Sequence, residues 1–69
     1  MAQRAIKVKV REGRQVVRRA TVIMDPDRDR DALDVLGDSL RELGVRRPGP
    51  EHSIELYDGP RYLRTVSAA

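Results

Sequence analysis

The segment IKVKVREGRQVVRRATVIM, residues 6–24, decides the fold, because it reads as two strands joined by a turn. In its first part Ile6, Val8 and Val10 alternate with basic residues, which is the period of a half-buried strand. Gly13 can adopt the positive φ that a tight hairpin loop requires. The segment therefore predicts a β-hairpin with one apolar face and one basic face.

The second strand of this hairpin, which spans residues 5–24, alternates less regularly, and two registers remain open. A two-residue loop at Glu12 and Gly13 places Val17, Arg19, Thr21 and Ile23 beside the apolar face of the first strand. A three-residue loop, Glu12 to Arg14, places Val16, Arg18, Ala20, Val22 and Met24 there. Either register leaves one arginine on the inner face. That arginine reaches water near the hairpin tip, or a bulge at Val16 and Val17 turns it outwards.

An amphipathic helix is predicted over residues 29–43. The preceding DPDRDRD segment contains a proline and four alternate aspartates, which end the strand and begin the helix. Leucines then recur at helical spacing and form one apolar stripe, at Leu33, Leu36, Leu40 and Leu43. Gly44 is expected to end the helix with Val45 folding back on the stripe. Gly37, inside the helix, is expected to pack closely against a strand.

A Pro- and Gly-rich loop leads to a second predicted hairpin, residues 54–66. The order strand, strand, helix, strand, strand predicts a single small α+β domain over residues 1–69, with the helix covering one face of a mixed sheet. In this order the chain resembles the β-grasp arrangement of ubiquitin-like domains, although the resemblance is one of topology only. The C-terminal Gly-Gly that conjugated ubiquitin-like proteins use is missing, so a conjugation role is not expected.

Composition narrows the class of protein. The 69 residues contain no cysteine, which excludes a disulfide scaffold and a thiolate zinc site. The N-terminus lacks the apolar run of a signal peptide, and no window has the length of a membrane span. We therefore expect a cytoplasmic protein that does not contact a membrane. Twelve of the fourteen basic residues are arginine, a bias typical of high-GC genomes, which favours a bacterial or phage origin.

The sequence does not predict catalysis. The single histidine, His52, lies in a Pro-Gly loop and is interpreted as an exposed loop residue. The aspartates from Asp25 to Asp31 have the alternate spacing of a calcium loop, but Arg30 stands where that loop needs glycine. They are interpreted as helix-capping residues. No glycine-rich phosphate loop is present. We therefore expect no enzyme activity, no catalytic residue, no cofactor and no metal site.

The charges are unevenly distributed along the chain. Residues 1–24 hold seven basic residues and one acid, or +6, whereas residues 25–42 hold three basic residues and seven acids, or −4. The basic residues of the first hairpin are therefore the candidate partner-binding residues, namely Lys7, Lys9, Arg11, Arg14, Arg18 and Arg19.

Two functions fit this pattern. The first is a small non-catalytic protein-interaction module that binds an unidentified protein through the basic hairpin face, or that associates with itself through this face and the acidic helix start. The alternative is a nucleic-acid-binding protein, in which the hairpin residues contact phosphates. The scarcity of aromatic residues, with only Tyr57 and Tyr62, counts against the alternative.

Overall fold

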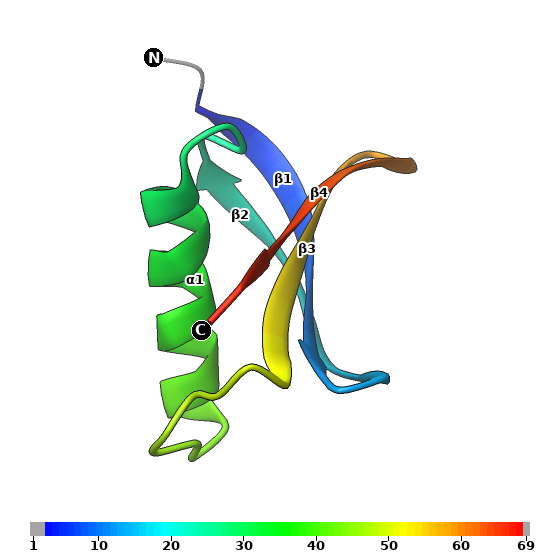
Figure 1. Ribbon diagram of the computed structural model, residues 1–69. Coiled ribbons are helices and arrows are strands. Elements are labelled where there is room, and N and C mark those ends of the chain that lie inside the picture. The colour runs from blue at the N-terminus through cyan, green and yellow to red at the C-terminus, as the bar shows by residue number, and fades with distance from the viewer. Residues whose placement is uncertain (1–2, 69) are drawn as a thin grey trace.

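The computed structural model describes residues 3 to 68 and folds them into two layers, a four-stranded sheet and one helix (Figure 1). The elements follow one another as β1 (Arg4–Glu12), β2 (Gln15–Met24), α1 (Asp29–Glu42), β3 (His52–Asp58) and β4 (Arg61–Ser67). The predicted α+β class and element order are therefore confirmed. Residues 1, 2 and 69, which the predicted domain includes, lie outside the described residues.

The sheet has the strand order β2-β1-β3-β4, and all three pairings are antiparallel. The mixed sheet that we expected is therefore wrong. The reason lies in the path of the chain: α1 returns the chain along the sheet after β2, so β3 runs in the same direction as β2 and opposite to β1. A parallel neighbour for β1 would require β4 to lie beside it, but β3 occupies that position.

The core lies between α1 and the inner face of the sheet, the face that the helix covers in Figure 1. The alternation in β1 buries Ile6, Val8 and Val10 completely. They pack with Met24, Ala32, Leu36, Leu40, Ile54 and Leu56 in a single hydrophobic cluster. The opposite face, called the outer face below, has no covering layer in the described part of the chain. The single helix thus leaves one whole side of the sheet exposed.

The first hairpin combines a two-residue turn with a bulge. The turn consists of Gly13, with a φ of +61°, and Arg14, since Glu12 pairs with Gln15. The register then shifts between Val10 and Arg11, so that β2 accommodates one extra residue. Beyond this bulge the inner face of β2 carries Arg18, Ala20, Val22 and Met24, as one of the two predicted registers required. Neither of the predicted loops occurs. The observed turn has two residues, and the extra residue of the bulge, Val17, produces the inner-face register that the three-residue loop was predicted to give.

The helix follows its predicted stripe only in part. Ala32, Leu36 and Leu40 are buried, whereas Leu33 and Leu43 are 41% and 44% exposed, and Leu43 is the C-cap residue rather than part of the helix. The end of the helix is as predicted: Gly44 has a φ of +80°, and the Val45 N–H donates to the Leu40 carbonyl at 2.8 Å. The expected close packing at Gly37 is wrong, since a Cβ atom there would meet no heavy atom within 4 Å.

Candidate functional site

Four of the six candidate residues share the outer face. Lys7, Lys9 and Arg11 alternate with the buried residues of β1 and therefore point away from the helix. Arg19 of β2 lies opposite Lys9. Further outer-face positions in this register include Val16, Thr21 and Ile23 on β2, and Ser53, Glu55 and Tyr57 on β3. The basic face predicted from the first hairpin is thus continued by the polar and aromatic side chains of the second hairpin.

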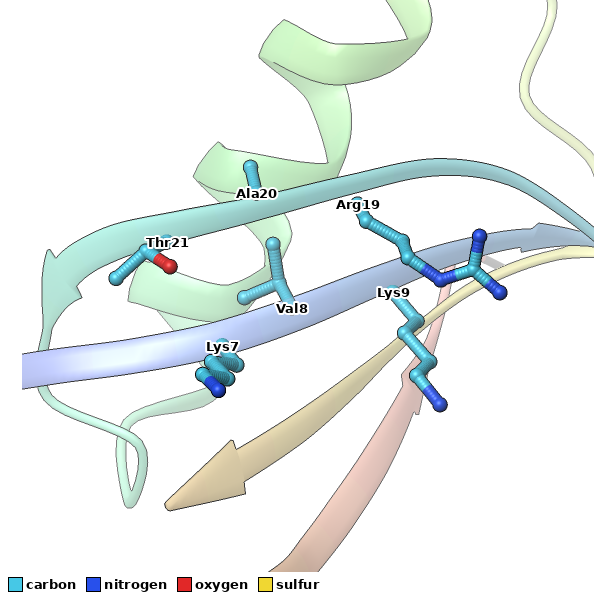
Figure 2. Close-up of a pocket in the computed structure, with 6 residues that line it drawn as sticks. All are labelled: Lys7, Val8, Lys9, Arg19, Ala20 and Thr21. Atoms are coloured by element: carbon cyan, nitrogen blue, oxygen red, sulfur yellow. The ribbon is translucent and has the colours of Figure 1, made fainter. Parts of the chain in front are cut away.

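A shallow hollow of about 290 Å³ lies on this face between β1 and β2. Its rim consists of Lys7 and Thr21 at one end and Lys9 and Arg19 at the other (Figure 2). The side chains of Val8 and Ala20 point to the helix side in Figure 2, so these residues contribute their backbone to the floor. Among residues 3 to 68, the three cationic side chains on the rim make no ion pair. We call this feature the cationic hollow.

Arg11 differs from the rim residues because its charge is compensated within the protein. Its Nε lies 2.9 Å from Glu55 Oε2, and its Nη1 donates to the Arg14 carbonyl at 2.9 Å. The Nε is buried and makes no directed hydrogen bond, so the carboxylate stabilises it by charge alone. Arg14 itself is exposed at the hairpin turn. The positive potential is therefore concentrated on Lys7, Lys9 and Arg19, with Arg14 at the tip.

Arg18 is not part of the outer face, so of the two arginines that the alternative registers left open, Arg18 is the one that faces the helix. It lies opposite Val10 on the inner face and forms an ion pair with Glu42 at the end of α1. A second arginine, Arg64 of β4, pairs in the same way with Asp29 in the first turn of α1. Arg64 could not be recognised from the sequence, because a second bulge, between Leu56 and Tyr57, determines which side chains of β4 face inwards.

The two tyrosines lie together on the outer face beside the cationic hollow. Tyr57 and Tyr62 are cross-strand partners with ring centroids 5.6 Å apart in an edge-to-face arrangement. Lys9 Nζ lies 4.8 Å from the centroid of the Tyr57 ring. Partial burial and the hydrogen bond that its hydroxyl donates to Glu55 raise the pKa of Tyr57 above its ordinary value. Tyr62 is 53% exposed, so its ring is accessible to a partner.

His52 is buried, so its interpretation as an exposed loop residue is wrong. The residue begins β3 and is only 4% exposed. Its Nδ1 accepts a hydrogen bond from the Gly49 N–H at 3.0 Å, so the proton of the neutral ring lies on Nε2, 3.2 Å from Glu12 Oε2. Together with the Gly13 N–H donating to the Glu51 carbonyl, these contacts attach the Pro-Gly loop to the hairpin tip. The histidine thus has a structural role in the fold.

The interpretation of the aspartates before α1 as helix-capping residues is wrong, because the N-cap residue is Arg28 and no side chain of the described residues caps the helix. Asp25 Oδ1 accepts a hydrogen bond from the Asp27 N–H, and Asp31 Oδ2 accepts one from the Asp25 N–H. Asp29 is held by Arg64. In residues 3 to 68 no group of three or more acidic or histidine side chains is arranged to hold a metal ion. The arrangement therefore stabilises the turn between β2 and α1.

Comparisons with models of known protein families, with curated proteins and with solved structures found no match to this chain. No helix in the described part of the chain is long and apolar enough to cross a membrane. The fold and the site together define a small α+β domain of the ββαββ type, with an antiparallel sheet and an uncovered outer face that carries a cationic hollow.

Proposed function

We propose that the protein is a non-catalytic interaction module that binds an acidic segment of a partner protein on its outer face. The observation that carries this proposal is the cationic hollow, in which three positive side chains lack ion-pair partners in the described residues. Three other arginines of the sheet are instead compensated within the protein: Arg11 by Glu55, Arg18 by Glu42 and Arg64 by Asp29. The rim cations are therefore available to the carboxylates of a partner.

The geometry explains how such a segment would be held. The rim places two cations at one end of the hollow and one at the other, so a short acidic segment lying across β1 and β2 meets positive charge along its length. The ion pairs are exposed to solvent, and each contributes at most about 1 kcal/mol. The interaction is consequently expected to be fast, weak and sensitive to salt.

Nucleic-acid binding is the second candidate, and the exposed ring of Tyr62 favours it. A base stacked on Tyr62 would lie on the same face as Lys9, whose charge could contact a phosphate. Against this stands the scarcity of rings on which bases could stack, since the chain contains no Phe or Trp and Tyr57 is partly buried. The protein partner therefore remains the first proposal.

Two further proposals are limited by the structure. Head-to-tail association of the basic hairpin with the acidic helix start has less support at Asp29, which is already paired with Arg64, than at the exposed Asp27. We also infer that the likeness to β-grasp domains is limited to the order of elements. The mixed sheet that we predicted with that arrangement does not occur, because β1 pairs antiparallel with β3.

The test is fluorescence anisotropy with four labelled probes: a glutamate-rich peptide, single-stranded DNA, duplex DNA and RNA. Each is titrated with the protein at about 50 mM and about 150 mM salt. We expect the peptide to bind at both salt concentrations and the Lys7→Gln/Lys9→Gln/Arg19→Gln variant to lose this binding. Preferential binding of a nucleic acid that persists at the higher salt concentration would instead establish the second candidate.

A matched control separates the hollow from the overall charge. The Arg46→Gln/Arg47→Gln/Arg61→Gln variant also removes three positive charges, from exposed positions outside the hollow. It should bind the peptide about as well as the parent protein does. Equal loss of binding in the two triple variants would show that net charge, not the hollow, attracts the probe. Circular dichroism of both variants verifies that the fold is retained.

A further inference from the structure

The free edge of β2 is the second exposed feature of the sheet. β2 is the terminal strand in the order β2-β1-β3-β4, so in the described part of the chain its far side pairs with no other strand. Residues 20–24, with the sequence ATVIM, form an uncharged stretch of high β-propensity on this edge. Ile23 within it is 67% exposed, more than any other large apolar side chain of the described residues. Such an edge is a template for the addition of another strand.

We propose that a second copy of the chain pairs antiparallel with β2 about a twofold axis at Val22. Val22 then lies opposite its own copy, and Thr21 lies opposite Ile23 of the second copy. The same relation holds in the reverse sense, because the contact is isologous. Residues 20–24 of both copies are paired, and the two sheets join into one. This inference does not depend on the binding function proposed for the outer face.

The distribution of charge along β2 favours this register, because an axis at Ala20 or Thr21 would place Arg19 opposite an uncharged residue. An axis at Arg18 or Arg19 would place identical arginines opposite one another, which is destabilising. An axis at Val22 instead brings Arg19 to the end of β2 in the second copy, where Asp25 is buried and the exposed Asp27 supplies the accessible negative charge. Arg18 adds little repulsion because Glu42 already compensates it. Moving the axis on to Ile23 would shorten the pairing, since β2 ends at Met24.

The structure also indicates what the pairing would bury. Ile23 and Thr21 alternate on the outer face with the half-buried Val22 on the helix side, so both faces of the seam would contain apolar contacts. The contact is only five residues long in each copy, which places it at the small end of protein interfaces. We therefore expect a dimer that forms reversibly as the protein concentration rises. A twofold axis perpendicular to the sheet would leave both cationic hollows on the same side.

Cysteine cross-linking tests the register, because the chain has no cysteine of its own. Directly opposite residues have Cα atoms about 4.5 to 5.5 Å apart, within the range of a disulfide, whereas diagonal neighbours lie about 7 to 8 Å apart. Val22→Cys should therefore form a disulfide-linked dimer about tenfold faster than Ile23→Cys. Random collisions would favour the more exposed Ile23→Cys, so cross-linking that is as fast or faster at position 23 overturns the proposed register.

Sedimentation equilibrium between about 10 µM and about 1 mM tests the interface without relying on that substitution. We expect Ile23→Lys to weaken dimerisation at least about tenfold, whereas Tyr62→Lys, on the opposite edge strand, should have little effect. Arg19→Glu should also weaken dimerisation. This variant lowers the net charge, which would strengthen any non-specific association, so a weaker dimer would identify a specific contact. A parent protein that stays monomeric throughout, or that is unaffected by Ile23→Lys, would overturn the proposal.

Discussion

Arg18 and Arg19 are adjacent in the chain and lie on opposite faces of the sheet. Arg19 is exposed on the rim of the cationic hollow, and Arg18 faces the helix and pairs with Glu42. Successive side chains of a strand always point to opposite faces, but only the pairing with β1 decides which of the two is inside. A binding defect is therefore expected from Arg19→Gln, whereas Arg18→Gln would affect the contact between sheet and helix.

Gly37 offers a single-residue test of the helix. Alanine has the higher helix propensity, and a Cβ at this position meets no heavy atom within 4 Å. We therefore expect Gly37→Ala to raise the free energy of unfolding by about 1 kcal/mol. The measurement is urea denaturation followed by circular dichroism.

Gly44 provides the matched control for this substitution. Its φ of +80° lies in the left-handed region, where a Cβ costs about 1 to 2 kcal/mol. Gly44→Ala should therefore destabilise the protein although the space around it is equally open. If both substitutions changed stability in the same direction, the open space at Gly37 would not explain the result.

Tyr57 provides a test based on pH. Its partial burial, together with the hydrogen bond to Glu55, raises its pKa above the ordinary value of 10.0. The folded state therefore favours the protonated phenol, and this contribution to stability is lost as the pH rises above 10. In the Tyr62→Phe variant, absorbance at about 295 nm reports Tyr57 alone, and we expect a titration midpoint above 10.

The Glu55→Gln substitution separates the causes of this shift. It removes the negative charge beside the Tyr57 hydroxyl, so the midpoint should move down towards the ordinary value. The part that results from burial should remain. An unchanged midpoint in the Glu55→Gln variant would mean that the carboxylate does not influence the phenol.

At the scale of the elements, α1 is attached to both edges of the sheet. Arg18 on β2 pairs with Glu42 in the last turn, and Arg64 on β4 pairs with Asp29 in the first turn. Asp29 also complements the positive end of the helix dipole. The two pairs thus fix the ends of the helix over opposite edge strands, while the leucines hold its middle.

A double-mutant cycle measures the contribution of one of these attachments. Because the side chains of Arg18 and Glu42 are partly exposed, their coupling energy should be only about 0.2 to 1 kcal/mol. We expect this coupling between Arg18→Ala and Glu42→Ala to decrease at about 1 M salt, as screening increases. A coupling near zero at low salt would show that the pair does not position the helix.

At the scale of the whole molecule, stability depends on a core that comprises nine buried apolar residues among residues 3 to 68. A domain of this size has little reserve, so the loss of one large side chain is a substantial fraction of its stability. Leu36→Ala and Leu40→Ala should each cost about 2 to 5 kcal/mol in thermal or urea denaturation. Leu33→Ala, at a position that is 41% exposed, should cost much less. Similar losses at all three positions would contradict the observed orientation of the helix.

The outer-face residues of β1 could be predicted from the sequence, but their partners on other strands could not, because the alternation of side chains is a local pattern. Strict alternation in β1 placed Lys7, Lys9 and Arg11 on the outer face without any knowledge of the partner strands. The compensation of Arg11 by Glu55 could not be predicted, because it joins residues 44 positions apart that only the β1–β3 pairing brings together. The same holds for the contact between His52 and Glu12.

The sequence by itself determined the elements of this protein: the period of two in β1, the leucine spacing of α1 and the glycine at the helix end are local patterns with local physical causes. The tertiary structure alone decided that β3 rather than β4 lies beside β1, that Arg18 rather than Arg19 faces the helix, and that His52 is buried. These features depend on bulges and on contacts between residues far apart in the sequence. Such contacts stabilise the protein only once the sheet and the helix have packed together, so no local pattern predicts them.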